Sequence, residues 1–242
     1  MTDKQAPCIH CQNAFEGNFC ANCGQPKVVR RIDGRYIVSE LMRIANFEKG
    51  VLFTIKELLL RPGRNVQIFI HSDRQRLVKP IFFIILCSLI YTLAQQLLRF
   101  EDGYIDGGGF GESAVNQVFA WIQGNYGYAN IIMAVFIALW IKVFFRKYRY
   151  NFFEILILLC YVMGMGMLLY TVFGIAESLS GFRILQLGGL LAISYAAWFI
   201  GTFFDSKRKL NYLFGLLCYC LGMISSFIGA FLLGLLMDLI IQ

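Results

Sequence analysis

Four cysteines near the start of the chain have the spacing of a metal site. Cys8 and Cys11 form one CxxC pair, Cys20 and Cys23 form the other, and eight residues separate the pairs. Two thiolates with this spacing can bind one metal ion, and two such pairs complete a tetrahedral site. Because all four ligands are cysteines, no coordination position is left for a substrate, which is typical of structural zinc. The sequence therefore predicts a structural Zn²⁺ bound by Cys8, Cys11, Cys20 and Cys23.

Two other uses of these thiols are open, a pair of disulfides and an iron site of the rubredoxin type. A cytoplasmic location disfavours disulfides, because thiols there stay reduced. Gly24 follows the second pair and can adopt the positive φ that such a turn needs, whereas Gln12 holds the matching place after the first pair. A segment this short cannot bury a sufficient core, so metal binding would supply its folding free energy.

One further cluster of side chains could do chemistry. It precedes the first long apolar segment and consists of His71, Asp73, Arg74 and Arg76. Basic groups at this position can contact phosphate or anionic lipid headgroups. A simpler interpretation, which we favour, is that they only fix membrane topology. If the protein acted as an enzyme on lipid headgroups, His71 would be the candidate acid–base residue of this segment.

No catalytic motif stands out elsewhere. The chain has no HExxH, GxSxG, P-loop or Rossmann glycine pattern, so we expect that it is not an enzyme. The other four cysteines lie inside apolar segments, where we interpret them as small core side chains: Cys87, Cys160, Cys218 and Cys220.

The composition indicates a membrane protein. Of the 242 residues, 58% are hydrophobic and 15% are charged, and the mean hydropathy is +0.61. Soluble domains have about 45–50% apolar and about 25% charged residues. This excludes a disordered chain or a coiled coil, and argues against a soluble enzyme domain. The apolar residues form five segments that we predict to be transmembrane helices, at 80–98, 127–145, 152–174, 184–204 and 212–241.

The predicted fold class is an all-α polytopic membrane protein, with about five transmembrane helices and a small N-terminal zinc ribbon. The predicted segments are apolar on all sides rather than alternating, which excludes a barrel. We expect a zinc ribbon at 1–27, a basic linker with amphipathic juxtamembrane helices at 28–79, and the transmembrane domain at 80–242. Arg61-Pro62-Gly63 should end one juxtamembrane helix and begin the next. A short helix around 115–122 is expected either on the outer membrane surface or packed on the bundle.

The loop charges predict an orientation. Lys and Arg are abundant before the first span, between the second and third spans, and between the fourth and fifth spans. They are scarce in the other loops and after the fifth span. By the positive-inside rule, the N-terminus is cytoplasmic and the C-terminus lies outside. The first 36 residues hold no apolar run suited to a signal peptide, which agrees. The net charge of +7 is thus a topology signal, and no nucleic-acid partner is expected.

Within the spans, ionisable residues fall only near the ends, which argues against a proton-coupled pump. A stripe of small residues in the fifth span predicts close helix packing, either within the bundle or in a homo-oligomer: Gly222, Ser226, Ala230 and Gly234.

The order of these features resembles a known family. A ribbon precedes Phe53-Thr54-Ile55-Lys56-Glu57-Leu58-Leu59 and Arg61-Pro62-Gly63, and a basic stretch ends in Lys79-Pro80-Ile81-Phe82-Phe83. Over residues 8–98 this resembles an uncharacterised bacterial family of inner-membrane proteins with an N-terminal four-cysteine zinc ribbon, which is a domain of unknown function. The resemblance implies a multi-pass inner-membrane protein with a cytoplasmic ribbon, and it implies no activity.

We therefore expect an integral inner-membrane protein whose cytoplasmic zinc ribbon is an interaction, assembly or regulatory module. Its expected partners are the lipid bilayer and a protein that binds the ribbon. The alternative is a transporter or channel for a lipid-like or apolar solute, in which four glycines act as hinges rather than packing sites: Gly164, Gly166, Gly188 and Gly189.

Overall fold

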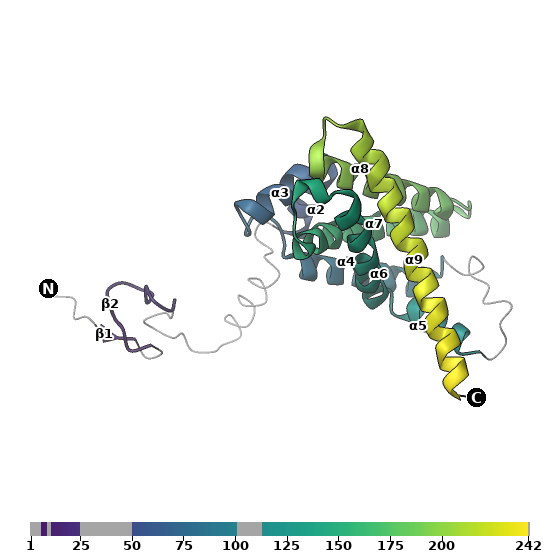
Figure 1. Cartoon of the computed structure of the whole chain (residues 1–242), viewed down its shortest axis with the longest axis horizontal. Coiled ribbons are helices and arrows are strands. Elements are labelled where there is room, and N and C mark those ends of the chain that lie inside the picture. Colours follow the sequence, from purple (N-terminus) through teal and green to yellow (C-terminus); the bar gives the residue numbers. More distant parts are fainter. Residues whose placement is uncertain (1–5, 9–10, 25–49, 101–112, 242) are drawn as a thin grey trace. The chain divides into compact units, whose positions relative to one another are not determined.

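The computed structural model describes residues 6–8, 11–24, 50–100 and 113–241, which belong to two compact units (Figure 1). Met1–Phe47 forms the first unit and Glu48–Gln242 the second. The predicted features outside the described residues include residues 28–49 of the linker and juxtamembrane region, and residues 101–112 between the first two predicted spans.

The described part of the first unit is a hairpin that carries the cysteines. Strand β1 (Ala6–Pro7) pairs antiparallel with β2 (Ala14–Phe15), so that Ala6 lies opposite Phe15. Cys8 follows β1 directly, and the connection between the strands holds the first cysteine pair. The second pair follows β2. Residues 16–19 therefore separate β2 from the second pair, and this segment contains Gly17, whose φ is +102°.

The second unit is helical throughout its described secondary structure. In chain order the elements are α2 (Val51–Leu60), α3 (Pro62–His71), α4 (Pro80–Leu98), α5 (Ala114–Gly124), α6 (Tyr126–Phe144), the 3₁₀ helix η1 (Arg146–Tyr148), α7 (Phe152–Ser180), α8 (Leu185–Asp205) and α9 (Lys209–Ile241). A helix stands at each of the five predicted spans. The predicted fold class, an all-α polytopic protein with a small cysteine ribbon, is confirmed.

Four of these helices, α4, α7, α8 and α9, are long and apolar enough to cross a membrane. Helix α6 has a shorter apolar stretch, Tyr128–Phe144. These helices are consistent with a multi-pass membrane protein. At 33 residues, α9 is about 50 Å long, well beyond the roughly 30 Å of a hydrocarbon core.

Local sequence explains where several helices begin and end. Asn151 and Glu154 form a capping box at the start of α7, with each side chain accepting a hydrogen bond from the backbone of the other. The helix runs beyond the predicted residue 174 and ends at Gly181, whose φ of +72° is left-handed. Pro62 and Pro80 each take the first position of a helix, as predicted.

Helix α7 lies at the centre of the bundle, against α4, α6 and α8. Its side chains Leu158, Leu159 and Tyr161 are fully buried. Two of the glycines considered as hinges sit at close contacts instead. A Cβ on Gly164 would lie 2.8 Å from Phe83, and one on Gly188 would lie 2.6 Å from Phe173. These glycines therefore let neighbouring aromatic rings approach the helix backbone.

The α2–α3 corner packs against the end of α8. Val66, Phe69 and Ile70 are buried on α3. A Cβ on Gly63 would collide with the backbone of Thr202 and Phe203, so the corner requires glycine at this position. A hydrogen bond from the Gln67 side chain to the Phe203 carbonyl joins the same two helices.

Helix α5 packs on the last part of α9, as Figure 1 shows. The rings of Phe119 and Phe227 stack at 6.3 Å between centroids, and Val115 is buried. The backbone N–H of Ala114 donates to the Asp238 carboxylate at 2.6 Å. Of the two positions expected for this helix, packing on the bundle is the one observed.

Candidate functional site

The two cysteine pairs form matching turns. The N–H of Gln12 donates to the Cys8 carbonyl and the N–H of Gly24 donates to the Cys20 carbonyl, both at 2.8 Å. Gln12 has φ +58° and Gly24 has φ +73°. Each residue that follows a pair is therefore in the left-handed region, which confirms the positive φ expected at Gly24 and extends it to Gln12.

These turns bring the four thiols together. The Sγ atoms of Cys8 and Cys23 are 3.5 Å apart, those of Cys11 and Cys20 are 3.6 Å apart, and all four lie within 4.8 Å of one another. Tetrahedral zinc with Zn–S bonds of about 2.3 Å separates its sulfurs by about 3.8 Å. A disulfide needs about 2.05 Å, and none of these four cysteines forms one. The cluster therefore fits a metal ion and not disulfides.

The surroundings of Cys11 favour its ionised form. Hydrogen bonds from the backbone of Asn13 and from the Asn22 side chain outweigh desolvation and lower the pKa of Cys11 to about 6. Cys8 and Cys20 are buried, whereas Cys23 is exposed. A metal ion bound here would link the two turns. His10, which lies between the cysteines of the first pair, is outside the described residues.

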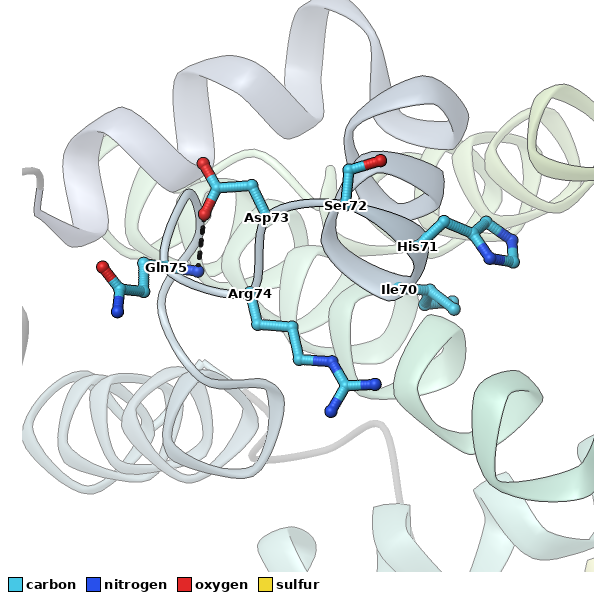
Figure 2. A pocket seen from close by; sticks show the side chains of 6 residues that line it. All are labelled: Ile70, His71, Ser72, Asp73, Arg74 and Gln75. Carbon is cyan, nitrogen blue, oxygen red and sulfur yellow. Dashed lines mark hydrogen bonds between the residues drawn. The ribbon is translucent and has the colours of Figure 1, made fainter. Parts of the chain in front are cut away.

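The predicted cluster before the first span divides into two parts. Figure 2 shows the first part, where His71, Asp73 and Arg74 border a shallow pocket of about 350 Å³. Their side chains point in different directions. The Asp73 carboxylate accepts from the backbone N–H of Gln75 at 2.9 Å, while Arg74 extends away from it. No acid–base pair forms among these exposed residues.

Arg76, the remaining member, belongs to a structural network. Its guanidinium donates to the Glu57 carboxylate at 3.0 Å and to Oδ1 of Asn65 at 3.2 Å. The Asn65 amide in turn donates to the carbonyls of Glu57 and Arg61 at 2.9 Å. Arg76 therefore connects α2, α3 and the segment before α4. We call Glu57, Asn65 and Arg76 the hairpin clamp.

Sequence reasoning did not find the other two members of the clamp. Asn65 is only 3% exposed, and it stands among Val66, Phe69 and Ile70 on the buried side of α3. A polar residue on an otherwise apolar face is the signal that could have identified Asn65, because buried polar groups need partners.

Thr54 is also buried, and its hydroxyl accepts a hydrogen bond from the N–H of Val78 at 3.1 Å. Tyr161 donates to the Val78 carbonyl at 2.7 Å.

The basic loops predicted to share one side lie at one end of the bundle. The ring of His71 is 5.7 Å from that of Tyr150, and Tyr148 accepts a hydrogen bond from Asn211 at 2.8 Å. These contacts bring together α3, the segment after α6 and the α8–α9 corner. The exposed basic residues at this end include Arg74, Arg146, Lys147, Arg149, Lys207 and Lys209.

The small-residue stripe of α9 faces helices of the same chain at both ends. A Cβ on Gly222 would collide with Ile137 of α6, and one on Gly234 would lie 2.6 Å from the backbone of Val115 in α5. Ser226 donates to the Met223 carbonyl at 2.8 Å within α9. Ser226 and Ala230 border a cavity inside the bundle. Packing within the chain thus accounts for the two glycines.

Comparison with known proteins gives one partial match. Residues 48–92 match a family described as a protein of unknown function (DUF3667). The matched segment comprises α2, α3 and most of α4, and it includes the whole hairpin clamp. No curated protein and no solved structure matches the chain.

Proposed function

We propose that the chain is a bacterial inner-membrane protein whose cytoplasmic zinc ribbon is an interaction or assembly module, and that it is not an enzyme. The observation that carries this proposal is the cluster of four thiols, which surrounds a metal position with cysteine ligands only. Such a site leaves no open coordination position for chemistry and serves to fold a small surface. The separate compact unit that holds it suits the binding of a protein partner.

Metal content provides the direct test. The double variant Cys8→Ser with Cys11→Ser should lose the zinc that the purified wild-type protein retains at about one ion per chain, because two of four ligands are removed. The matched control is Cys220→Ser, which removes a thiol of α9 and should leave the zinc content unchanged. Iron in place of zinc, or full zinc retention by the double variant, would contradict the proposed centre.

The interaction role needs a separate measurement. Proteins that co-purify with the wild type after crosslinking should be lost from the double cysteine variant, while its amount in the membrane stays the same. Cys220→Ser should keep them. If the double variant retains every partner, the ribbon is not the binding module.

The proposed orientation places the N-terminus in the cytoplasm and the C-terminus outside. The grouping of the basic loops at one end of the bundle supports it, because Lys and Arg accumulate on the cytoplasmic side. A reporter enzyme that works only outside the cytoplasm should be active when fused after Gln242. The same reporter fused after Arg149 should be inactive. The reverse pattern would overturn the orientation.

A homo-oligomer through the stripe of α9 remains a prediction. Since α6 and α5 cover Gly222 and Gly234, and Ser226 and Ala230 border the cavity, a second copy would have to reach these two positions through the open side of that cavity. Replacing both with Leu should reduce the mass of the detergent-solubilised particle if the stripe joins two chains. An unchanged mass would contradict this interface.

Transport of a lipid-like or apolar solute is the second candidate function. The observation that favours it is an apolar cavity of about 670 Å³ within the bundle. Flux of an apolar dye or scrambling of labelled lipid in proteoliposomes would distinguish it from a pure assembly role, since the latter predicts neither.

A further inference from the structure

The cavity inside the bundle is lined by residues of six helices. Its walls come mainly from α5, α6, α7 and α9, with one residue each from α4 and α8. Its volume of about 670 Å³ is within the roughly 300–1,000 Å³ of small-molecule sites. Along α9 it extends from Tyr219 to Leu233, which at 1.5 Å per residue is about 21 Å. One leaflet of a hydrocarbon core is about 15 Å thick. The cavity is therefore long enough for one lipid chain.

One side of the cavity is open and the other is deep in the protein. At the open side are Ile132, Phe227 and Leu233, which are 50%, 52% and 53% exposed. At the deep side are Tyr91 and Met163, both 3% exposed. In a membrane, the exposed apolar surfaces of α6 and α9 are covered by lipid. The open side of the cavity thus meets hydrocarbon rather than water.

The chemistry of the walls selects an apolar and flexible occupant. Met133, Met163, Met167 and Met223 contribute soft side chains that adapt to irregular shapes. Two of the polar side chains are engaged within the protein: the Asn130 amide donates to Sδ of Met167 at 3.4 Å, and Ser226 donates within its own helix.

We infer that this cavity binds one acyl chain of a membrane phospholipid. Phospholipid chains are the hydrocarbon present in large excess at its open side, so mass action favours them even at modest affinity. The inference depends on insertion of the bundle into a bilayer and not on the ribbon. It assigns the cavity a ligand whether or not the protein transports one.

Gly166 offers a clean way to fill the cavity. It lines the wall on α7, and a Cβ built on it meets no atom within 4 Å. Gly166→Leu therefore adds a side chain at the cavity wall whose Cβ has open space, and it also removes a helix-weakening glycine. Gly124→Leu is the matched control, because Gly124 also has open space around its Cβ and does not line the cavity. Ala230→Leu fills the cavity from α9 instead.

Native mass spectrometry of the delipidated, full-length protein tests the inference, with palmitoyl-oleoyl-phosphatidylglycerol as the probe. The wild type and Gly124→Leu should each retain one lipid at an affinity that agrees within twofold. Gly166→Leu should bind at least tenfold more weakly. If Gly166→Leu is not recovered from membranes, Ala230→Leu takes its place and should likewise bind the lipid at least tenfold more weakly than the wild type.

Three results would overturn the inference. One is equal lipid retention by the wild type and the filled variants, and another is the absence of a tightly held lipid in the wild type. The third is a strong preference for an isoprenoid alcohol such as farnesol over the phospholipid in a competition arm. A cavity variant that loses lipid but keeps its zinc would show that the lipid site is independent of the ribbon. The ribbon is tested separately by the double cysteine variant.

Discussion

Gln12 and Gly24 hold equivalent positions in the four-cysteine cluster but differ in conformational strain. Both have positive φ, at +58° and +73°, and a left-handed backbone costs a residue with a Cβ about 1–2 kcal/mol. Glycine avoids this cost. The turn after the first cysteine pair therefore carries backbone strain that the turn after the second pair does not.

Gln12→Gly should strengthen metal retention. The relief of strain exceeds the extra chain entropy that glycine brings to the unfolded state, so a net gain of up to about 1 kcal/mol is expected. Competition with a chelator should then show up to about fivefold tighter zinc binding. Gly24→Gln should have the opposite effect, and equal affinities for both variants would exclude strain as a factor.

At the scale of elements, the hairpin clamp joins α2, α3 and the segment before α4. Arg76 lies 11 residues after Asn65 and 19 after Glu57, yet contacts both. The Arg76 side chain is 37% exposed and that of Glu57 is 22% exposed, so solvent screening limits the ion pair. The buried Asn65 adds hydrogen bonds that water does not replace.

Arg76→Met should lower the free energy of unfolding by about 1–2 kcal/mol, since it removes the ion pair and leaves Oδ1 of Asn65 without its donor. Thermal unfolding in detergent would measure the loss. Arg74→Met is the control, because Arg74 is exposed and outside the clamp, and it should change stability by less than about 0.5 kcal/mol. Similar losses in both variants would rule out a specific clamp.

Asp238 couples two elements that are far apart in sequence. Its carboxylate accepts from the N–H of Ala114 at the start of α5, where Ser113 provides no side-chain cap. A negative charge at a helix N-terminus also interacts favourably with the helix dipole. The last turns of α9 thus serve as the cap of α5.

Asp238→Ala should therefore loosen α5 by about 1 kcal/mol. Hydrogen exchange of the first α5 amides should become about fivefold faster, with little change in α7. Asp205→Ala, which removes an acid at the end of α8, should leave α5 exchange unaltered. Unchanged exchange in α5 after Asp238→Ala would show that packing alone holds this helix.

At the scale of the whole molecule, the ribbon and the bundle are stabilised by different means. The bundle has a continuous core around α7, whereas the buried hydrophobic cluster of the described ribbon consists of cysteines. A unit of this size would depend on a bound metal ion for folding. The two units should therefore lose structure independently.

Removal of metal by a strong chelator at neutral pH should expose the ribbon thiols and leave the bundle intact. Labelling with a thiol reagent should then modify four additional cysteines per chain, while the unfolding temperature of the bundle shifts by no more than about 1 °C. A large drop in that temperature would mean that the ribbon also stabilises the bundle.

The sequence by itself determined the features that depend on local order. The two CxxC pairs predicted the thiol cluster, the apolar segments predicted the helices, and Pro62 and Pro80 predicted helix starts. Each follows from spacing, length or backbone geometry within a few turns, which tertiary packing seldom overrides. The alternation of loop charge likewise predicted that the basic loops lie at one end of the bundle.

Only the tertiary structure decided which distant residues meet. The clamp at Arg76, the cap supplied by Asp238 and the cavity beside Gly166 all join segments that lie apart in the chain. The sequence around a polar residue does not show which distant residue it will bond. The sequence around a glycine does not show whether it will contact a neighbouring helix or border an open space. Gly164 and Gly166 show this on one helix: the first lies against Phe83, whereas the second faces the cavity.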